Sequence, residues 1–141
     1  MLLGMFILVL VFSLAVPSFD KVAQATQLKA DAQKLAWLLR SCRQEAVYRN
    51  RAQTVLFYTN ASKYRISGGS YYSLGPDIGF VGTTTFTTRV AGVPACIFLP
   101  TGVPGSGGTV TLRNKYNLKS YIIVNPVAGR IRVSSRPPEN W

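Results

Sequence analysis

The sequence predicts an α+β protein in which one long N-terminal helix packs against an antiparallel β-sheet domain. Three observations support this fold class. The first 19 residues carry no charged side chain, residues 20–50 show apolar side chains at helical spacing, and the rest consists of short β-branched and aromatic runs separated by turn residues. A chain of 141 residues then contains one apolar helix and a single folded domain.

The apolar segment covers residues 2–19, in which the only polar side chains are Ser13 and Ser18. A helix of this length spans roughly 27 Å, which is close to the thickness of a bilayer core. A cleavable signal peptide is disfavoured, because no basic region precedes the segment and it continues directly into Pro17. We therefore expect a single-pass chain with a transmembrane half at residues 1–19 and a soluble domain at residues 20–141.

Beyond Pro17 the pattern becomes that of an amphipathic helix, which the proline is expected to bend rather than end. Apolar or small side chains recur every three or four residues. They are Val22, Ala25, Leu28, Ala32, Leu35, Leu39, Cys42 and Ala46. Near its end Glu45 is placed to pair with Arg49 one turn on, and Arg49 and Arg51 suit the negative end of the helix dipole.

A second pattern, typical of strands, begins near Thr54. The expected strands are residues 54–58, 63–66, 71–74, 83–90, 96–99, 109–112, 120–124 and 130–133. Glycine, proline and asparagine separate these runs, which predicts antiparallel hairpins. The glycine-rich stretch at residues 102–108 lacks the GK[ST] of a phosphate-binding loop and precedes a strand, so we interpret it as a hairpin connection.

The helix stripe needs an apolar partner, so Leu28, Leu35 and Leu39 are expected to pack on the sheet. Cys42 faces the same way, and Cys96 begins an apolar strand 54 positions later. Without histidine or a CxxC pair, the sequence suggests neither a zinc site nor a redox pair. Two alternatives stay open: a disulfide, which stabilises by about 3–4 kcal/mol in the loop-entropy model, or two buried thiols.

The charge is strongly positive, with 16 lysines and arginines against five acidic residues, for a net charge of +11. Such a surface favours anionic partners, which include nucleic acid, acidic lipids and an acidic neighbouring subunit. The sequence offers no paired carboxylates and no serine or cysteine near a plausible base. We therefore expect neither an enzyme nor a cofactor or metal site.

The order of these segments resembles the type IV pilins and the pseudopilins of type II secretion. The segment LAWLLRSCRQEAVYRNRAQTVLF at 35–57 is similar to the helix-to-first-strand region of the GspH/FimT branch. So are CIFLPTGVPGSGGTVTL and the closing YIIVNPVAGRIRV. The resemblance implies a pilin-like fold, anchoring in the inner membrane with the soluble domain outside the cytoplasm, and assembly with other pilins into a pilus or pseudopilus.

One departure from this family concerns the start of the chain. Family members have a basic leader, a glycine before the processing site, a phenylalanine at the mature start and a glutamate four residues later. Aligning residues 16–19 with the usual end of the segment places Met1 just after that glutamate. We expect that the chain begins at an internal methionine of a longer reading frame, or was trimmed, which the upstream sequence decides.

The sharpest functional hypothesis concerns the strand that contains Gly129, Arg130 and Arg132. Alternation along a strand places both arginines on one face and Ile131 on the other. Two adjacent guanidinium groups suit phosphates, and the strip is extended by further residues of the preceding hairpin. These are Arg113, Lys115 and Lys119, with Tyr116 and Tyr121 available for stacking on bases.

In FimT-like relatives the matching motif is implicated in DNA uptake by competent cells, so the resemblance implies DNA binding, with the filament tip as one location. Three alternatives remain: a solvated strand face, a purely structural secretion pseudopilin, and a basic domain that binds anionic lipid. The sequence does not identify which machine, for secretion, twitching or competence, contains the subunit.

Overall fold

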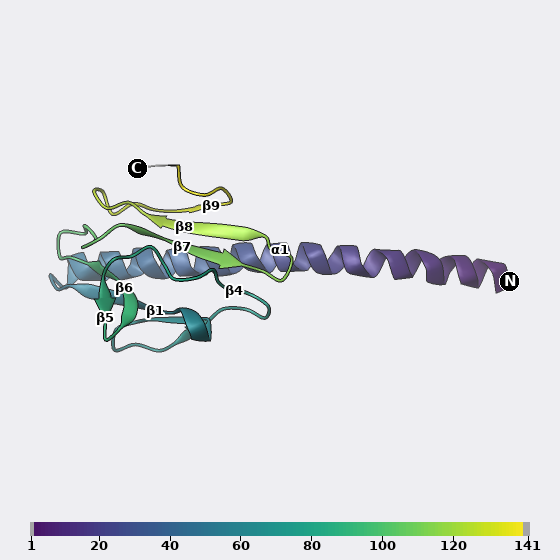
Figure 1. Ribbon diagram of the computed structural model, residues 1–141, viewed down its shortest axis with the longest axis horizontal. Helices are drawn as coiled ribbons and strands as arrows, with labels where there is room; N and C mark the ends of the chain where they lie inside the picture. Colours follow the sequence, from purple (N-terminus) through teal and green to yellow (C-terminus); the bar gives the residue numbers. More distant parts are fainter. Residues whose placement is uncertain (1, 140–141) are drawn as a thin grey trace.

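A single helix, α1 (Leu2–Tyr48), forms the first third of the chain, and its N-terminal half projects away from the β-domain (Figure 1). The computed structural model describes residues 2–139, so Met1 of the expected transmembrane half lies outside the described residues. Pro17 lies inside α1 without ending it, as the sequence predicted. Residues 2–19 are exposed throughout, and α1 is long and apolar enough to cross a membrane. Within residues 2–139, this half of the helix packs against no other part of the chain, and its apolar surface is suited to lipid.

The β-domain follows in short elements (Figure 1). They are β1 (Gln53–Tyr58), the 3-10 helix η1 (Thr59–Ala61), β2 (Lys63–Ile66), β3 (Tyr72–Ser73), β4 (Gly79–Phe80), β5 (Arg89–Val90), β6 (Val93–Phe98), β7 (Gly108–Arg113), β8 (Lys119–Val124) and β9 (Ile131–Ser134). All strand pairs are antiparallel. The predicted fold class, a long N-terminal helix with an antiparallel β-domain, is thereby confirmed.

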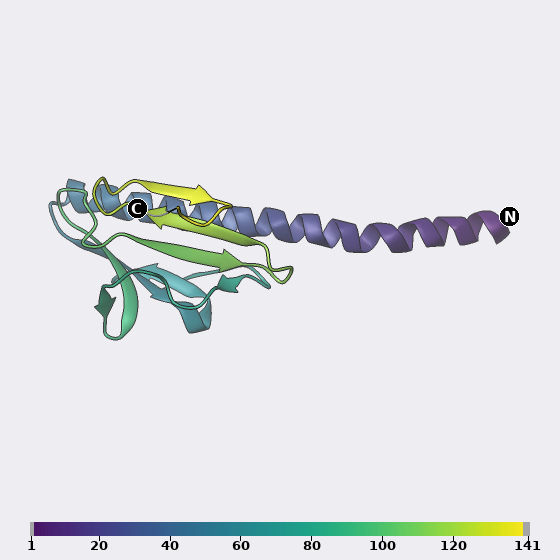
Figure 2. The same ribbon diagram turned by 45° about the horizontal axis from the view of Figure 1, so that its top comes forward.

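The strands form two sheets, where the sequence had suggested one. One sheet has the order β3-β2-β1-β6-β5, and the other has the order β4-β7-β8-β9. The division does not follow chain order, because β4 pairs with β7 in the four-stranded sheet whereas β5 pairs with β6 in the five-stranded sheet. Figure 2 shows α1 running beside both sheets, with β7, β8 and β9 aligned along it. The helix thus lies where both sheets contribute to its burial.

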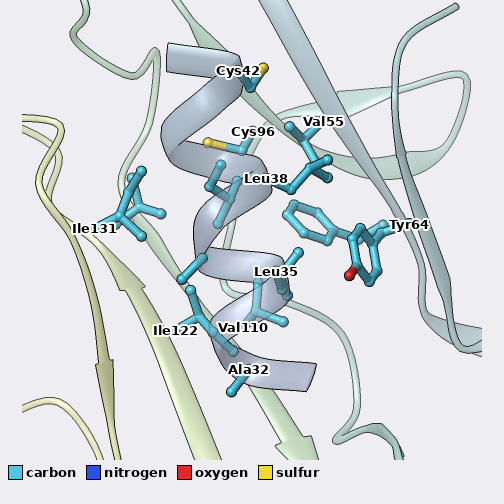
Figure 3. Close-up of a cluster of buried hydrophobic side chains, with 14 of the residues drawn as sticks. Ala32, Leu35, Leu38, Cys42, Val55, Tyr64, Cys96, Val110, Ile122 and Ile131 are labelled. Atoms are coloured by element: carbon cyan, nitrogen blue, oxygen red, sulfur yellow. The ribbon is translucent and has the colours of Figure 1, made fainter. Parts of the chain in front are cut away.

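The core lies between α1 and the two sheets (Figure 3). Leu28, Leu35 and Leu39 are all buried, which confirms the predicted packing stripe. Figure 3 shows helix side chains between Ile122 and Ile131 of the four-stranded sheet on one side and Val55 and Tyr64 of the five-stranded sheet on the other. The buried side chains of α1 are therefore shielded from water by both sheets. This burial stabilises the fold by roughly 25 cal/mol per Å² of apolar surface.

One expected strand was wrong. Residues 83–90, expected as one strand, contain only the two-residue β5. Within this segment Thr85 donates its backbone N–H to the Thr109 carbonyl at 3.1 Å, and its hydroxyl accepts a hydrogen bond from the Thr109 N–H at 2.7 Å. Phe86 stacks on the buried Phe57 at 5.5 Å between ring centroids. On α1 the β-domain covers the helix only from about Leu28 onward, so Val22 is 65% exposed.

Cys42 and Cys96 are both buried and both carry free thiols in the structure. Figure 3 shows their side chains in the same part of the core. Burial raises the pKa of the Cys42 thiol to about 12, with a smaller contribution from the charge of Glu45. Burial also raises the pKa of the Cys96 thiol. Neither group is placed for nucleophilic chemistry, because the reactive thiolate form is disfavoured at both positions.

Candidate functional site

The pairing of β8 with β9 places the two predicted arginines on the face of the sheet opposite to α1. Ile131 pairs with Val124, and both are buried on the inner face. Arg132 pairs with Ile123 on the outer face. Arg130, which directly precedes β9 at the edge of the sheet, lines the same small hollow as Arg132 and also borders α1. Both arginines are exposed. The predicted alternation along this strand is therefore present.

The turn before β9 sets the position of Arg130 directly before this strand. The side chain of Asn125 accepts hydrogen bonds from the backbone N–H groups of Val127 and Ala128, at 2.9 and 3.0 Å. Gly129 donates its N–H to the Asn125 carbonyl at 3.0 Å and has a φ of +62°. Gly129 is thus the residue that allows the chain to turn from the loop into the arginine-bearing strand.

Arg113 and Lys119 lie on the same outer face, at the other end of the sheet. They pair directly with each other across β7 and β8. Tyr121, which is half-buried, follows Lys119 on that face of β8 and precedes Ile123. The register therefore aligns Arg113, Lys119, Arg132 and Arg130 along one face over roughly 20 Å of strand length. We call these four residues the outer basic strip.

Lys115 is not part of this strip. Its Nζ lies 2.8 Å from a carboxylate oxygen of Asp20 and 3.8 Å from one of Asp77. The hydroxyl of Tyr116 also donates a hydrogen bond to Asp20. These hydrogen bonds, from Lys115 first and Tyr116 second, lower the pKa of Asp20. Lys115 and Tyr116 thus connect the β7–β8 turn to the helix and are already engaged.

The strip residues have no comparable partners. Within residues 2–139, no salt bridge involves Arg113, Lys119, Arg130 or Arg132. A small hollow of about 290 Å³ opens between Arg130 and Arg132, with Ile123 and Asn125 as its other lining residues. Among the described residues no group of three or more histidine, cysteine or acidic side chains is placed to hold a metal ion. The chemistry available on this face is electrostatic.

Sequence reasoning missed a second cluster of arginines, formed by Arg40 and Arg43 with Arg130. The two helix residues are 87 or more positions before Arg130 in the chain and meet it only in the folded domain. Their positions on α1 are those of the polar face of an amphipathic helix, a pattern that does not predict a cluster with a distant strand. The only available signal was the absence of an acidic residue one turn from Arg40.

Comparison with known proteins gives a family match over most of the chain. The model of the family described as type II transport protein GspH matches residues 31–135. No curated protein matches the whole sequence significantly. Among solved structures, the chain is similar to the type IV minor pilin FimU of Pseudomonas aeruginosa, at 17% identity over 84% of this chain and 97% of that one, with a TM-score of 0.63.

A second similar structure is the minor pseudopilin EpsH from the type 2 secretion system of Vibrio cholerae. It is 12% identical over 77% of this chain and 96% of that one, with a TM-score of 0.62. Another crystal form of FimU gives 19% identity and a TM-score of 0.59. At these identities the structural matches establish the fold, and the family model establishes the relationship.

Proposed function

The chain belongs to the family of the type II transport protein GspH, and from this premise we propose that it is a minor pilin-like subunit that binds DNA through the outer basic strip. The chain is a structural subunit, anchored by the N-terminal half of α1. Assembly takes place from the inner membrane, with the β-domain outside the cytoplasm and next to other pilin subunits. The domain division at residues 19 and 20 is part of this proposal.

The observation that carries the DNA contact is the alignment of four cations on one face. Arg113, Lys119 and Arg132 lie on the outer face of a single sheet whose opposite face is covered by α1, and Arg130 lies beside Arg132 at the edge of that sheet. Successive phosphates of one strand of B-form DNA rise by about 3.4 Å, so a strip of roughly 20 Å spans about six of them. Guanidinium groups can bind phosphate oxygens in a bidentate manner, which suits Arg130 and Arg132 at the hollow that they share.

A solvated strand face is the alternative, and the number of free cations argues against it. Within residues 2–139, none of these four side chains forms a salt bridge. The neighbouring Lys115, in contrast, pairs with both Asp20 and Asp77. Four like charges on one face repel one another, and a bound polyanion would relieve that repulsion. A location at the tip of the filament and a role in competence are consistent with this proposal, because a subunit at the tip exposes its DNA-binding face to external DNA.

The proposal is tested with the full chain in nanodiscs of zwitterionic lipid, where anionic lipid does not compete for the strip. Fluorescence anisotropy with a labelled 20-base-pair DNA duplex measures the dissociation constant. We expect Arg130→Ala plus Arg132→Ala to weaken binding at least about tenfold, since each charged contact contributes on the order of 1 kcal/mol.

A matched control removes the same charge elsewhere. Arg51→Ala plus Arg89→Ala also lowers the net charge by two, but both arginines are exposed and lie off the strip. This variant should bind DNA within about twofold of the parent chain. An equal loss of DNA affinity in both variants would show that only the net charge matters. Undiminished DNA binding by the strip variant would support a purely structural subunit instead.

A further inference from the structure

A second surface lies at the end of α1 that is farthest from the membrane half. A groove of about 590 Å³ opens there between the last turns of the helix, the loop after β6 and the start of β9. Its lining residues are Arg40, Arg43, Gln44, Val47, Tyr48, Thr101, Gly102, Arg130 and Ile131. Three arginines therefore surround one hollow, and Arg130 belongs both to this groove and to the outer basic strip. We call this hollow the helix-end groove.

Backbone hydrogen bonds hold two of these arginines in place. Arg43 donates through Nε to the Gly102 carbonyl at 2.8 Å, and Arg40 donates through Nη2 to the Ile131 carbonyl at 3.1 Å. Each guanidinium group has five N–H donors, so most remain free for a ligand. None of the described residues that line the groove is acidic, and the nearby Glu45 is paired with Arg49 at 2.8 Å. The groove is thus a preorganised site for carboxylate or phosphate groups.

Exposed aromatic residues continue the groove along the helix. Tyr48 is 91% exposed, and Trp37 is 62% exposed although it lies in the folded half of α1. Trp37, Arg40, Gln44 and Tyr48 follow one another at intervals of three and four residues, so they share one face of the helix. Tryptophan, tyrosine and arginine are the residue types that contribute most to protein interfaces.

These features favour a protein segment over a nucleic acid at the groove. Val47 is 51% exposed there, and the groove floor includes Ile131 and the backbone of Gly102. A phosphate backbone would leave these apolar surfaces in water, whereas a peptide with apolar and acidic side chains would cover them and pair with the arginines. A second copy of this chain is disfavoured by its net charge of +11.

We propose that the helix-end groove, with Trp37 beside it, binds a segment of a different and acidic pilin-like subunit, which presents carboxylates next to apolar side chains. This inference rests on the filament role proposed above and specifies the surface and the chemistry of the neighbour. Heteromeric assembly also separates the positive charges of successive copies of this chain.

Photo-crosslinking tests the proposal in cells that express the full chain together with its filament machinery. The crosslinker p-benzoylphenylalanine replaces Gln44, which is exposed and lines the groove. We expect an adduct with another pilin-like subunit, and mass spectrometry should place the crosslinked apolar residue within a few positions of an aspartate or glutamate. The same crosslinker at the exposed Ser70, beside the five-stranded sheet, should not give this adduct.

Three variants separate this groove from the DNA-binding strip. Tyr48→Ala removes a side chain that is almost fully exposed, so the fold should persist while the adduct yield falls at least about tenfold. Arg40→Glu should reduce it similarly by repelling the carboxylates. Arg132→Glu, on the strip and outside the groove, should leave the adduct yield unchanged.

The outcomes distinguish this inference from the filament role. A crosslinker at Val9, in the apolar half of α1, should report on filament neighbours independently of the groove. Adducts at Val9 without any at Gln44 would overturn the groove inference and leave the filament role intact. A Gln44 adduct with DNA, or with a segment that lacks acidic residues, would also overturn it. The absence of adducts at both positions would contradict the filament role itself.

Discussion

Gly129 is constrained both by its backbone and by its surroundings. Its φ of +62° lies in the left-handed region, and a Cβ built on it would lie 2.5 Å from the carbonyl oxygen of Gly102. The same Cβ would lie 3.3 Å from Nε of Arg43, which bonds that carbonyl. The residue therefore lies where the arginine-bearing strand meets the helix-end groove, and any side chain would push these elements apart.

Gly129→Ala should destabilise the fold through two separate effects. The left-handed backbone costs about 1–2 kcal/mol, and the collision with Gly102 adds about 1–3 kcal/mol. Gly92→Ala is the matched control, since Gly92 has a φ of +79° but an added Cβ would meet nothing within 4 Å. Urea unfolding of the full chain in detergent should show a loss that is clearly larger for Gly129→Ala. If the two variants lost equal free energy of unfolding, the close approach of the Cβ added at position 129 to Gly102 would be relieved without an energetic cost.

The two cysteines should behave as protected thiols. Because burial raises the pKa of Cys42 to about 12, only about one molecule in ten thousand carries that thiolate at pH 8. The folded chain should therefore react slowly with a thiol reagent at pH 8, and raising the pH toward 12 should accelerate the reaction. After unfolding without reductant, two thiols should be counted. A count of zero would show that Cys42 and Cys96 are joined.

At the scale of elements, a buried carboxylate joins α1 to the loop after β3. Asp31 is 3% exposed and accepts hydrogen bonds from the Gly75 N–H at 2.7 Å and from Gln27 Nε2 at 3.1 Å. No local pattern predicts this contact, because Gly75 lies 44 positions away from Asp31 in the chain. A charged group in this position is stable only because its oxygens have these donors.

Asp31→Ala should lower the free energy of unfolding by about 1–3 kcal/mol, because it leaves the Gly75 N–H without its acceptor. The matched control is Gln33→Ala, two residues away on the exposed face of the same helix. Thermal unfolding followed by circular dichroism gives the comparison. If both variants unfold at the same temperature, the Asp31 contact contributes nothing to holding the loop on the helix.

What the sequence predicted depends on how local each signal is. The burial of Leu28, Leu35 and Leu39 and the alternation around Arg130 and Arg132 follow from periodicity within one element, and both were predicted. The prediction of one strand at residues 83–90 was wrong, because β-branched threonines favour an extended chain whether or not a hydrogen-bonded ladder forms. Lys115 was assigned to the strip because its partner Asp20 lies 95 positions earlier, beyond the reach of any local pattern.

The split into two sheets was equally hidden from the sequence. It depends on pairings between segments that are far apart in the chain, such as that of β4 with β7, which no local pattern predicts. The helix-end groove has the same origin, because it joins residues of α1 to Arg130 across the whole domain. Sites formed by contacts between distant segments become visible only in the folded structure.

The whole molecule combines an apolar anchor with a basic domain that carries two distinct surfaces. Figure 1 shows β7, β8 and β9 lying along α1, so the outer basic strip extends in the direction of the helix. Its Arg113 and Lys119 end is nearer the membrane half, and its Arg130 end adjoins the helix-end groove. A subunit held by its anchor and its groove would keep the strip exposed along the side of a filament.

The dependence of DNA binding on salt tests the central claim most directly. If all four strip residues contact phosphates of duplex DNA, the logarithm of the association constant should fall with the logarithm of salt concentration at a slope of about −3.6. Arg130→Ala plus Arg132→Ala should bring that slope to about −1.8, whereas Arg51→Ala plus Arg89→Ala should leave it near −3.6. A slope that stays the same in the strip variant, or a parent chain that does not bind DNA at low salt, would contradict the account.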